Sequence, residues 1–235
     1  LAAVGLMVGA LQATGMTGSI TNILVNLAGD GPILLLMMGA LTSFVLGMGM
    51  TVTAAYIFLA IILAPALVQV GMEPMAVHMF VLYWGMLSFI TPPVALAAFA
   101  AASVAKCEPM ETGIEAMRIG TVIYFIPFFF VFNPALLLIS SWDEIVIVLV
   151  TALIGILLVS AGLQGYLIGA GRLNFNTVGV LGRISLVIGG LTLAGPSGGM
   201  LGISHWGLVG AAIVISAPGI FIAYMGGKAD KAAAA

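Results

Sequence analysis

Long apolar stretches, separated by short groups of charged or polar residues, dominate the pattern of this sequence. The stretches lie at residues 3–28, 31–72, 75–105, 119–141, 145–166, 184–199 and 206–226. A helix needs about 20 residues to cross the hydrocarbon core of a bilayer. The pattern therefore predicts an all-α, polytopic membrane protein, in which most of these stretches are single spans.

The stretch 31–72 is too long for one helix, and it carries no charged residue. The sequence Gly47-Met48-Gly49 divides it into arms at about 33–46 and 53–70, each short for a full crossing. Glycine accepts backbone conformations that other residues avoid, so we expect a sharp turn at these positions. Two short arms around a glycine-rich tip favour a re-entrant helical hairpin, although two full crossings would leave its ends on the same sides of the membrane.

The stretch 75–105 is interrupted by Thr91-Pro92-Pro93. Proline removes a backbone donor and clashes with the preceding turn of a helix. We therefore expect a discontinuous helix that starts again at Pro92 or Pro93. Backbone groups freed inside a bilayer must be covered by protein or by a wet cavity.

The two interruptions together predict a site at mid-membrane. The first hairpin arm ends at the tip, so the carbonyls of Gly47 and Gly49 suit a hard cation such as sodium. The second arm is expected to begin near Thr53, a good N-cap residue, and its free N–H groups favour an anion. Thr51 and Thr53 are therefore candidate substrate-binding residues.

The broken helix offers the other half of this predicted site. Ser88 and Thr91 supply hydroxyls and carbonyls for sodium, and Thr91 and Pro92 lie where a new helix start could meet the substrate. Either interruption alone is as typical of a kinked membrane helix as of a site. Two of them, each flanked by hydroxyls, favour the site.

The connecting segments predict the domain organisation. Residues 106–118 are expected to form an amphipathic helix at the membrane surface, which completes a transport domain at 1–141. Further transmembrane helices follow at 142–227, around a polar connection at 167–183, and a cytoplasmic tail at 228–235. With Arg118 placed in the cytoplasm, this topology puts every Lys and Arg, and the C-terminus, on the cytoplasmic face.

Composition excludes several classes of protein. Hydrophobic residues make up 63% of the 235 residues and charged residues only 6%, against roughly 25% in soluble domains. No basic cluster is present that would bind nucleic acid. The single cysteine, Cys107, allows no internal disulfide. No nucleophile with a base lies within a span, so an enzyme is not expected, and no cofactor is expected beyond a coupling sodium ion.

Three motifs resemble the large permease subunit of TRAP transporters. They are the runs Gly47–Tyr56, Ile90–Ala95 and Phe132–Leu137. The likeness is to the fused (4TM/12TM, TAXI-like) type, and it covers residues 1–140 well. Residues 145–227 resemble its extra C-terminal spans more loosely. The chain starts at Leu1 and is expected to be the C-terminal portion of a longer protein.

The resemblance implies a sodium-driven importer in the bacterial or archaeal inner membrane. Such importers take organic acids, mostly carboxylates, from an extracytoplasmic solute-binding protein. Their fold contains inverted repeats, each with a hairpin and a broken helix, and this chain would hold the second repeat. The family commonly has Pro at the position of Thr51 and Thr at the position of Val52, which places a side-chain ligand at position 52 in doubt.

One other function class stays open on the residues alone. A channel or an ion-translocating subunit of a larger complex would also consist of apolar spans. Such a protein more often shows rings of charge or a repeated filter motif, and neither is visible in this sequence. Secondary import is therefore the preferred prediction.

Overall fold

The computed structural model describes residues 2–29, 31–174, 176–195 and 204–233. Within them the chain forms two compact units, Leu1–Val131 and Phe132–Ala235. Nearly all the described residues are helical, in agreement with the prediction of a polytopic, all-α membrane protein; a two-stranded hairpin is the exception.

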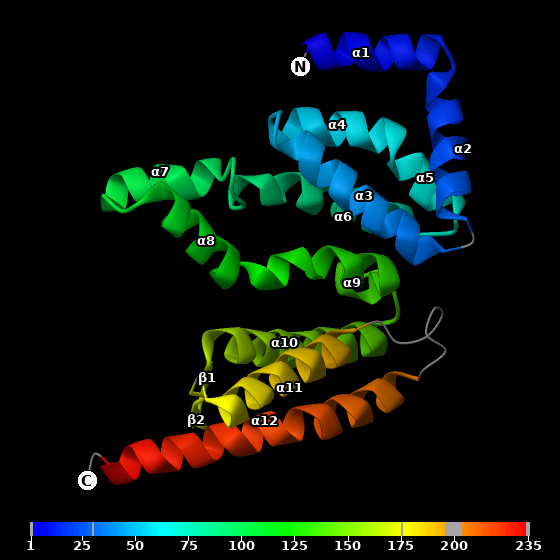
Figure 1. Ribbon diagram of the computed structural model, residues 1–235. Coiled ribbons are helices and arrows are strands. Elements are labelled where there is room, and N and C mark those ends of the chain that lie inside the picture. The colour runs from blue at the N-terminus through cyan, green and yellow to red at the C-terminus, as the bar shows by residue number, and fades with distance from the viewer. Residues whose placement is uncertain (1, 30, 175, 196–203, 234–235) are drawn as a thin grey trace. The chain divides into compact units, whose positions relative to one another are not determined.

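The first unit consists of short helices (Figure 1). They are α1 (Ala2–Ala13), α2 (Met16–Ala28), α3 (Pro32–Gly47), α4 (Val52–Ile62), α5 (Ala64–Gln69), α6 (Pro74–Met86), η1 (Leu87–Phe89), α7 (Leu96–Ala105), α8 (Pro109–Ile119), η2 (Thr121–Tyr124) and α9 (Ile126–Phe132). The helix α6 packs against α3, α4 and α5. Fully buried apolar side chains fill this contact: Leu35, Leu36, Leu59, Leu63, Leu67, Val77, Phe80 and Val81.

The stretch 3–28 is not one straight helix, although its two helices together are long and apolar enough for a broken span. The chain bends by 81° between α1 and α2. Gly15 adopts a left-handed conformation there, with φ 69°, which only glycine enters without strain. Just before it, the Thr14 hydroxyl donates to the carbonyl of Ala10 and satisfies the end of α1.

The hairpin arms appear where the sequence predicts them, with one difference. The first arm is the single helix α3, whereas the second is divided into α4 and α5 at Leu63. Pro65, in the first turn of α5, has no N–H to continue the helical hydrogen bonds. At 16 residues, α3 is about 24 Å long, which is short of the roughly 30 Å hydrocarbon core.

The stretch 119–141 is not one kinked span. It contains the short helices η2, α9 and η3 (Pro134–Leu137), and α8 joins the η2–α9 segment with a bend of 68°. Asn133 separates α9 from η3, because its side chain caps η3 by accepting a hydrogen bond from the N–H of Ala135. The expected amphipathic helix is present as α8, with Glu108 as its cap and an exposed Glu115–Arg118 ion pair.

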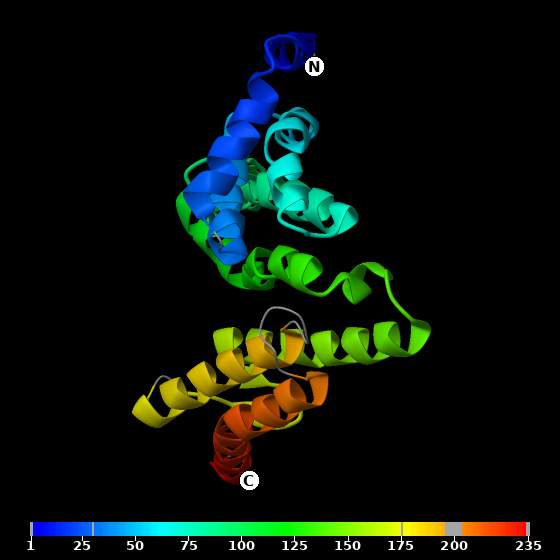
Figure 2. The same ribbon diagram turned by 90° about the vertical axis from the view of Figure 1, so that its right-hand side faces the viewer.

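The second unit is built on three long helices (Figures 1 and 2). They are α10 (Trp142–Gln164), α11 (Thr177–Ala194) and α12 (His205–Ala233), with the strands β1 (Tyr166–Leu167) and β2 (Gly171–Arg172) between α10 and α11. The helix α11 packs along both α10 and α12, which hardly touch each other. All three helices are long and apolar enough to span a membrane.

Two boundaries in this unit differ from the expected ones. The polar connection at 167–183 is largely ordered, because β1 and β2 pair antiparallel and α11 already begins at Thr177. Asn176 starts α11 by accepting a hydrogen bond from the N–H of Gly179. The helix α12 continues to Ala233, through most of the expected tail. The end of the expected span at 184–199 lies outside the described residues.

Candidate functional site

The hairpin tip is a tight connection between two helix ends. At the end of α3, the N–H of Met48 donates to the carbonyl of Phe44 and that of Gly49 to the carbonyl of Leu46. Thr51 then caps α4, with its hydroxyl oxygen accepting from the N–H of Ala54 at 3.4 Å. The cap is therefore Thr51, whereas the sequence suggested Thr53; Thr53 lies exposed in the first turn of α4.

Close packing, rather than an unusual backbone angle, explains the glycine at position 47. Neither Gly47 nor Gly49 has a φ in the left-handed region, so that part of the expectation is wrong. A Cβ on Gly47 would lie 2.2 Å from the carbonyl oxygen of Gly85, a backbone atom of α6. A Cβ on Gly49 would meet nothing closer than 4.0 Å. Only Gly47 is therefore required to be glycine by its neighbours.

Ser88 joins the tip to the broken helix. Its buried hydroxyl lies 3.0 Å from the carbonyl oxygen of Gly47 and 3.1 Å from that of Gly85. The first of these contacts links positions 41 residues apart in sequence. The end of α3 and the end of α6 are thus held against each other by a glycine–glycine approach and a shared hydroxyl.

The break after α6 includes more residues than expected. After η1 the helix does not restart at Pro92 or Pro93 but at Leu96. Ala95 adopts a left-handed conformation with φ 36°, and its N–H donates to the carbonyls of Ser88 and Thr91, both at 3.1 Å. This turn brings Ala95 back beside Ser88, at the end of η1. Pro92 is covered by α8, where a Cβ on Gly113 would lie 2.8 Å from its ring.

Thr91 is turned toward a cluster of aromatic side chains that includes Trp84, Tyr124 and Phe128. The Thr91 hydroxyl bonds the carbonyl of Leu87 at 2.7 Å and also the hydroxyl of Tyr124. The ring of Tyr124 packs edge-on against Trp84, which also contacts Phe128. Tyr124 is the one hydroxyl-bearing residue in the run 124–132, and that signal could have identified it.

One further buried hydroxyl lies near the tip. Ser43 is on α3, one helical turn before Gly47, and is fully buried. Its Oγ has no hydrogen-bond partner among the described residues. A buried hydroxyl normally has such a partner, so Ser43 supplies an additional unpaired oxygen beside the tip. Sequence reasoning missed it, because a serine in an apolar helix usually bonds its own backbone.

The structure thus brings together only part of the predicted set. Gly47 and Ser88 are in contact, and Thr91 lies one turn from Ser88, whereas Gly49, Thr51 and Thr53 are exposed at the tip. No hydrogen bond among the described residues joins Thr51 or Thr53 to the broken helix. The site carries no charged side chain, and within the described ranges no three His, Cys, Asp or Glu residues gather to hold a metal. Neutral oxygens and helix ends are what it offers a ligand.

Comparison with known proteins identifies a family for this chain. A family model described as "Tripartite ATP-independent periplasmic transporter, DctM component" matches residues 1–145. No curated protein and no solved structure matches the chain. The matched region contains the whole hairpin and the whole broken helix. The chain therefore belongs to the DctM family, the large membrane component of TRAP transporters, which in general work with a solute-binding protein.

Proposed function

We propose that this chain takes part in the sodium-coupled import of organic acids, with the hairpin tip and the broken helix as one half of the transport site. The observation that carries the proposal is the contact of Ser88 with the carbonyl of Gly47. It holds the carbonyl end of α3 at the break in α6, where helix dipoles and unpaired oxygens favour a cation. Transporters in general place ions at such helix breaks.

The sodium ligands are proposed to be neutral oxygens. Carbonyls of Gly47 and Gly49, the hydroxyls of Ser88 and Thr91, and the unpaired oxygen of Ser43 lie on the two breaks. Hard cations prefer oxygen ligands. The absence of a fixed carboxylate from residues 31–72 means that a bound sodium ion would carry the only full charge at the tip.

The substrate is proposed to be a carboxylate that meets helix N-termini. The start of α4, capped by Thr51, presents N–H groups to the exposed side of the tip, with Thr53 beside them. Helix N-termini favour anions. Thr91 and Pro92 would approach from the broken helix, with Tyr124 fixing the Thr91 hydroxyl.

The membrane arrangement follows the charges. Asp143 and Glu144 begin α10, while Arg172 and Lys228 lie at the hairpin and near the end of α12. We propose that the basic end faces the cytoplasm of a bacterial or archaeal cell, as the positive-inside rule states. The solute-binding protein would then act on the opposite, extracytoplasmic face.

The proposal is tested by uptake of a labelled organic acid into proteoliposomes containing the full-length permease and its binding protein. Ser88→Ala should raise the sodium concentration needed for half-maximal uptake by roughly fivefold, because the lost hydrogen bond to Gly47 contributes about 1 kcal/mol. Ser103→Ala is the matched control, since the Ser103 hydroxyl is exposed and bonds only its own helix. Full uptake in sodium-free buffer, or equal sodium titrations for the two variants, would refute the assignment.

A further inference from the structure

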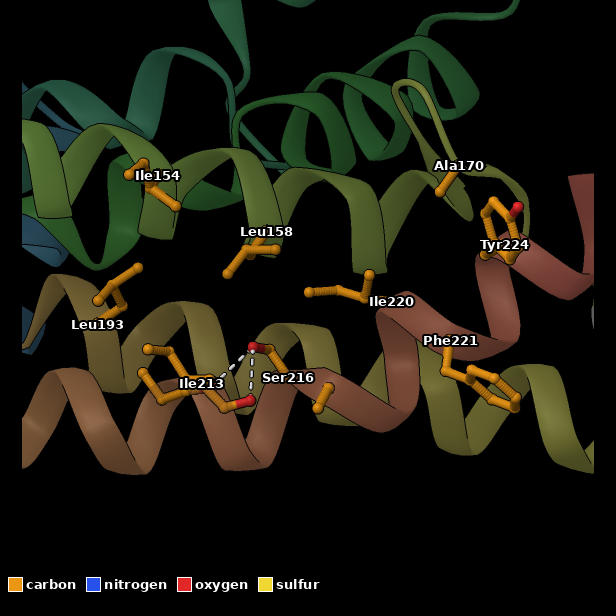
Figure 3. A pocket seen from close by; sticks show the side chains of 11 residues that line it. Ile154, Leu158, Ala170, Leu193, Ile213, Ser216, Ile220, Phe221 and Tyr224 are labelled. Atoms are coloured by element: carbon orange, nitrogen blue, oxygen red, sulfur yellow. Dashed lines mark hydrogen bonds between the residues drawn. The ribbon is translucent and has the colours of Figure 1, made fainter.

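An apolar groove runs along the second unit between α10 and α12. It forms because both helices pack on α11 but hardly touch each other. Its volume is about 510 Å³. In Figure 3, Ile154 and Leu158 of α10 form one wall, Ile220 of α12 lies opposite, and Ala170 and Tyr224 lie together at one end.

The groove offers almost no hydrogen bonding along its length. Ser216 is the one hydroxyl in its middle, and that hydroxyl donates to the carbonyl of Ala212 on its own helix at 2.7 Å. The lining on α12 extends from Ala212 to Tyr224, a rise of about 18 Å. One leaflet of a bilayer has a hydrocarbon depth of about 15 Å. The groove therefore matches the length of an acyl chain in one leaflet.

Basic residues lie at the Tyr224 end of the groove. The β1–β2 hairpin packs its backbone directly on α12, since Cβ atoms on Gly226 and Gly227 would lie 2.4 Å and 2.0 Å from the carbonyls of Arg172 and Ala170. Arg172 is thereby fixed beside this part of α12, and Lys228 follows Tyr224 by one helical turn.

Both basic side chains are available to a ligand. Arg172 and Lys228 are exposed, and neither forms an ion pair with any described residue. The net charge at this end of the groove is positive, so it would attract an anionic headgroup.

The side chains of the groove suit a lipid better than another helix. Membrane helices pack on one another through small residues, and α11 does so here. Gly190 meets Gly155 of α10, and Gly182 meets Gly219 of α12, each at a backbone approach that leaves no room for a Cβ. The groove contains small residues too, Ala212, Ser216 and Ala217, but most of its lining is branched or aromatic, with Ile213 and Phe221 more than 60% exposed. Such walls leave gaps that a flexible chain can fill and a helix backbone cannot.

We propose that this groove binds an anionic phospholipid, with one acyl chain between α10 and α12 and the phosphate held by Arg172 and Lys228. Native mass spectrometry of the whole chain in detergent, titrated with phosphatidylglycerol or phosphatidylcholine of the same acyl chains, tests it. Each basic residue near an anionic lipid headgroup contributes about fivefold in affinity, whereas the phosphate of phosphatidylcholine is neutralised by its own choline group. Phosphatidylglycerol should therefore bind roughly 25-fold more tightly than phosphatidylcholine.

Two matched pairs of variants separate the headgroup from the chain. Arg172→Gln with Lys228→Gln should remove the preference for phosphatidylglycerol, whereas Lys106→Gln, an exposed cation of the first unit, should keep it. Ala217→Trp should fill the groove and weaken binding of both lipids at least tenfold. Val214→Trp, on the same helix but outside the groove and 73% exposed, should not.

Several results would overturn the proposal. Equal affinity for the two lipids would do so, as would equal behaviour of the paired variants. A dimer seen by light scattering and abolished by Ala217→Trp would assign the groove to a second copy of the chain instead. If Ala217→Trp does not fold, the charge variants still decide, because their side chains are exposed. The titration needs neither sodium nor a transport substrate, so its outcome is independent of the proposed import function.

Discussion

The contact of Gly47 with Gly85 provides the sharpest test of the site's construction. In Gly47→Ala, the new Cβ would lie 2.2 Å from the Gly85 carbonyl oxygen and 3.0 Å from the Gly85 Cα. Ordinary contact begins at 3.4 Å, so α3 and α6 would have to separate by about 1 Å. No flexible side chain can relieve the contact, because the opposing atoms are backbone.

Two costs follow from this separation. Overpacking in a well-packed interior destabilises by about 1–3 kcal/mol. The Ser88–Gly47 hydrogen bond, now 3.0 Å, would stretch to near 4 Å and be lost, which costs about 1 kcal/mol more. We expect Gly47→Ala to destabilise the first unit by about 2–4 kcal/mol and to abolish uptake.

Gly49→Ala is the matched control, two residues away in the same tip with open space around its Cα. The assay is thermal unfolding of the purified protein followed by helical circular dichroism, combined with uptake in proteoliposomes. Gly47→Ala should lower the melting temperature by roughly 4–16 °C, and Gly49→Ala by less than about 2 °C. Equal melting temperatures and equal uptake for the two variants would show that the glycine approach does not support the site.

Two further predictions concern the aromatic cluster and the second unit. Tyr124→Phe should lower stability by about 1 kcal/mol and weaken uptake, because the Thr91 hydroxyl loses one of its two partners and keeps only the Leu87 carbonyl. Tyr83→Phe is the control, since its hydroxyl bonds no described residue, and equal melting temperatures would contradict the role of Tyr124. Gly190→Val should destabilise the second unit by about 2 kcal/mol or more, because its Cβ would lie 2.5 Å from the carbonyl oxygen of Gly155 on α10. Gly210→Val is the control, since its Cβ would meet open space. Similar thermal unfolding of these two variants would refute the glycine packing.

Both breaks could be predicted, and the structure has both interruptions. The cause is local at Thr91-Pro92-Pro93, where proline cannot continue a helix, whereas Gly47 and Gly49 at the other break have ordinary backbone angles and Gly47 is required by its approach to Gly85. Apolar length likewise predicted helices, and the family match over residues 1–145 confirms the resemblance to a TRAP large permease. The bend at Gly15 was missed, because one glycine in a membrane stretch is usually tolerated without a break.

The sequence by itself determined that this protein is a helical membrane protein with two interrupted helices, because hydropathy, glycine and proline act on their own neighbourhood. Only the tertiary structure decided which groups meet. Ser88 reaches Gly47 across 41 residues, Tyr124 reaches Thr91 across 33, and Gly85 is placed against the tip. Such pairings depend on how α3, α6 and η2 pack. Packing in an apolar interior is set by the shapes of many side chains at once, which no local pattern records.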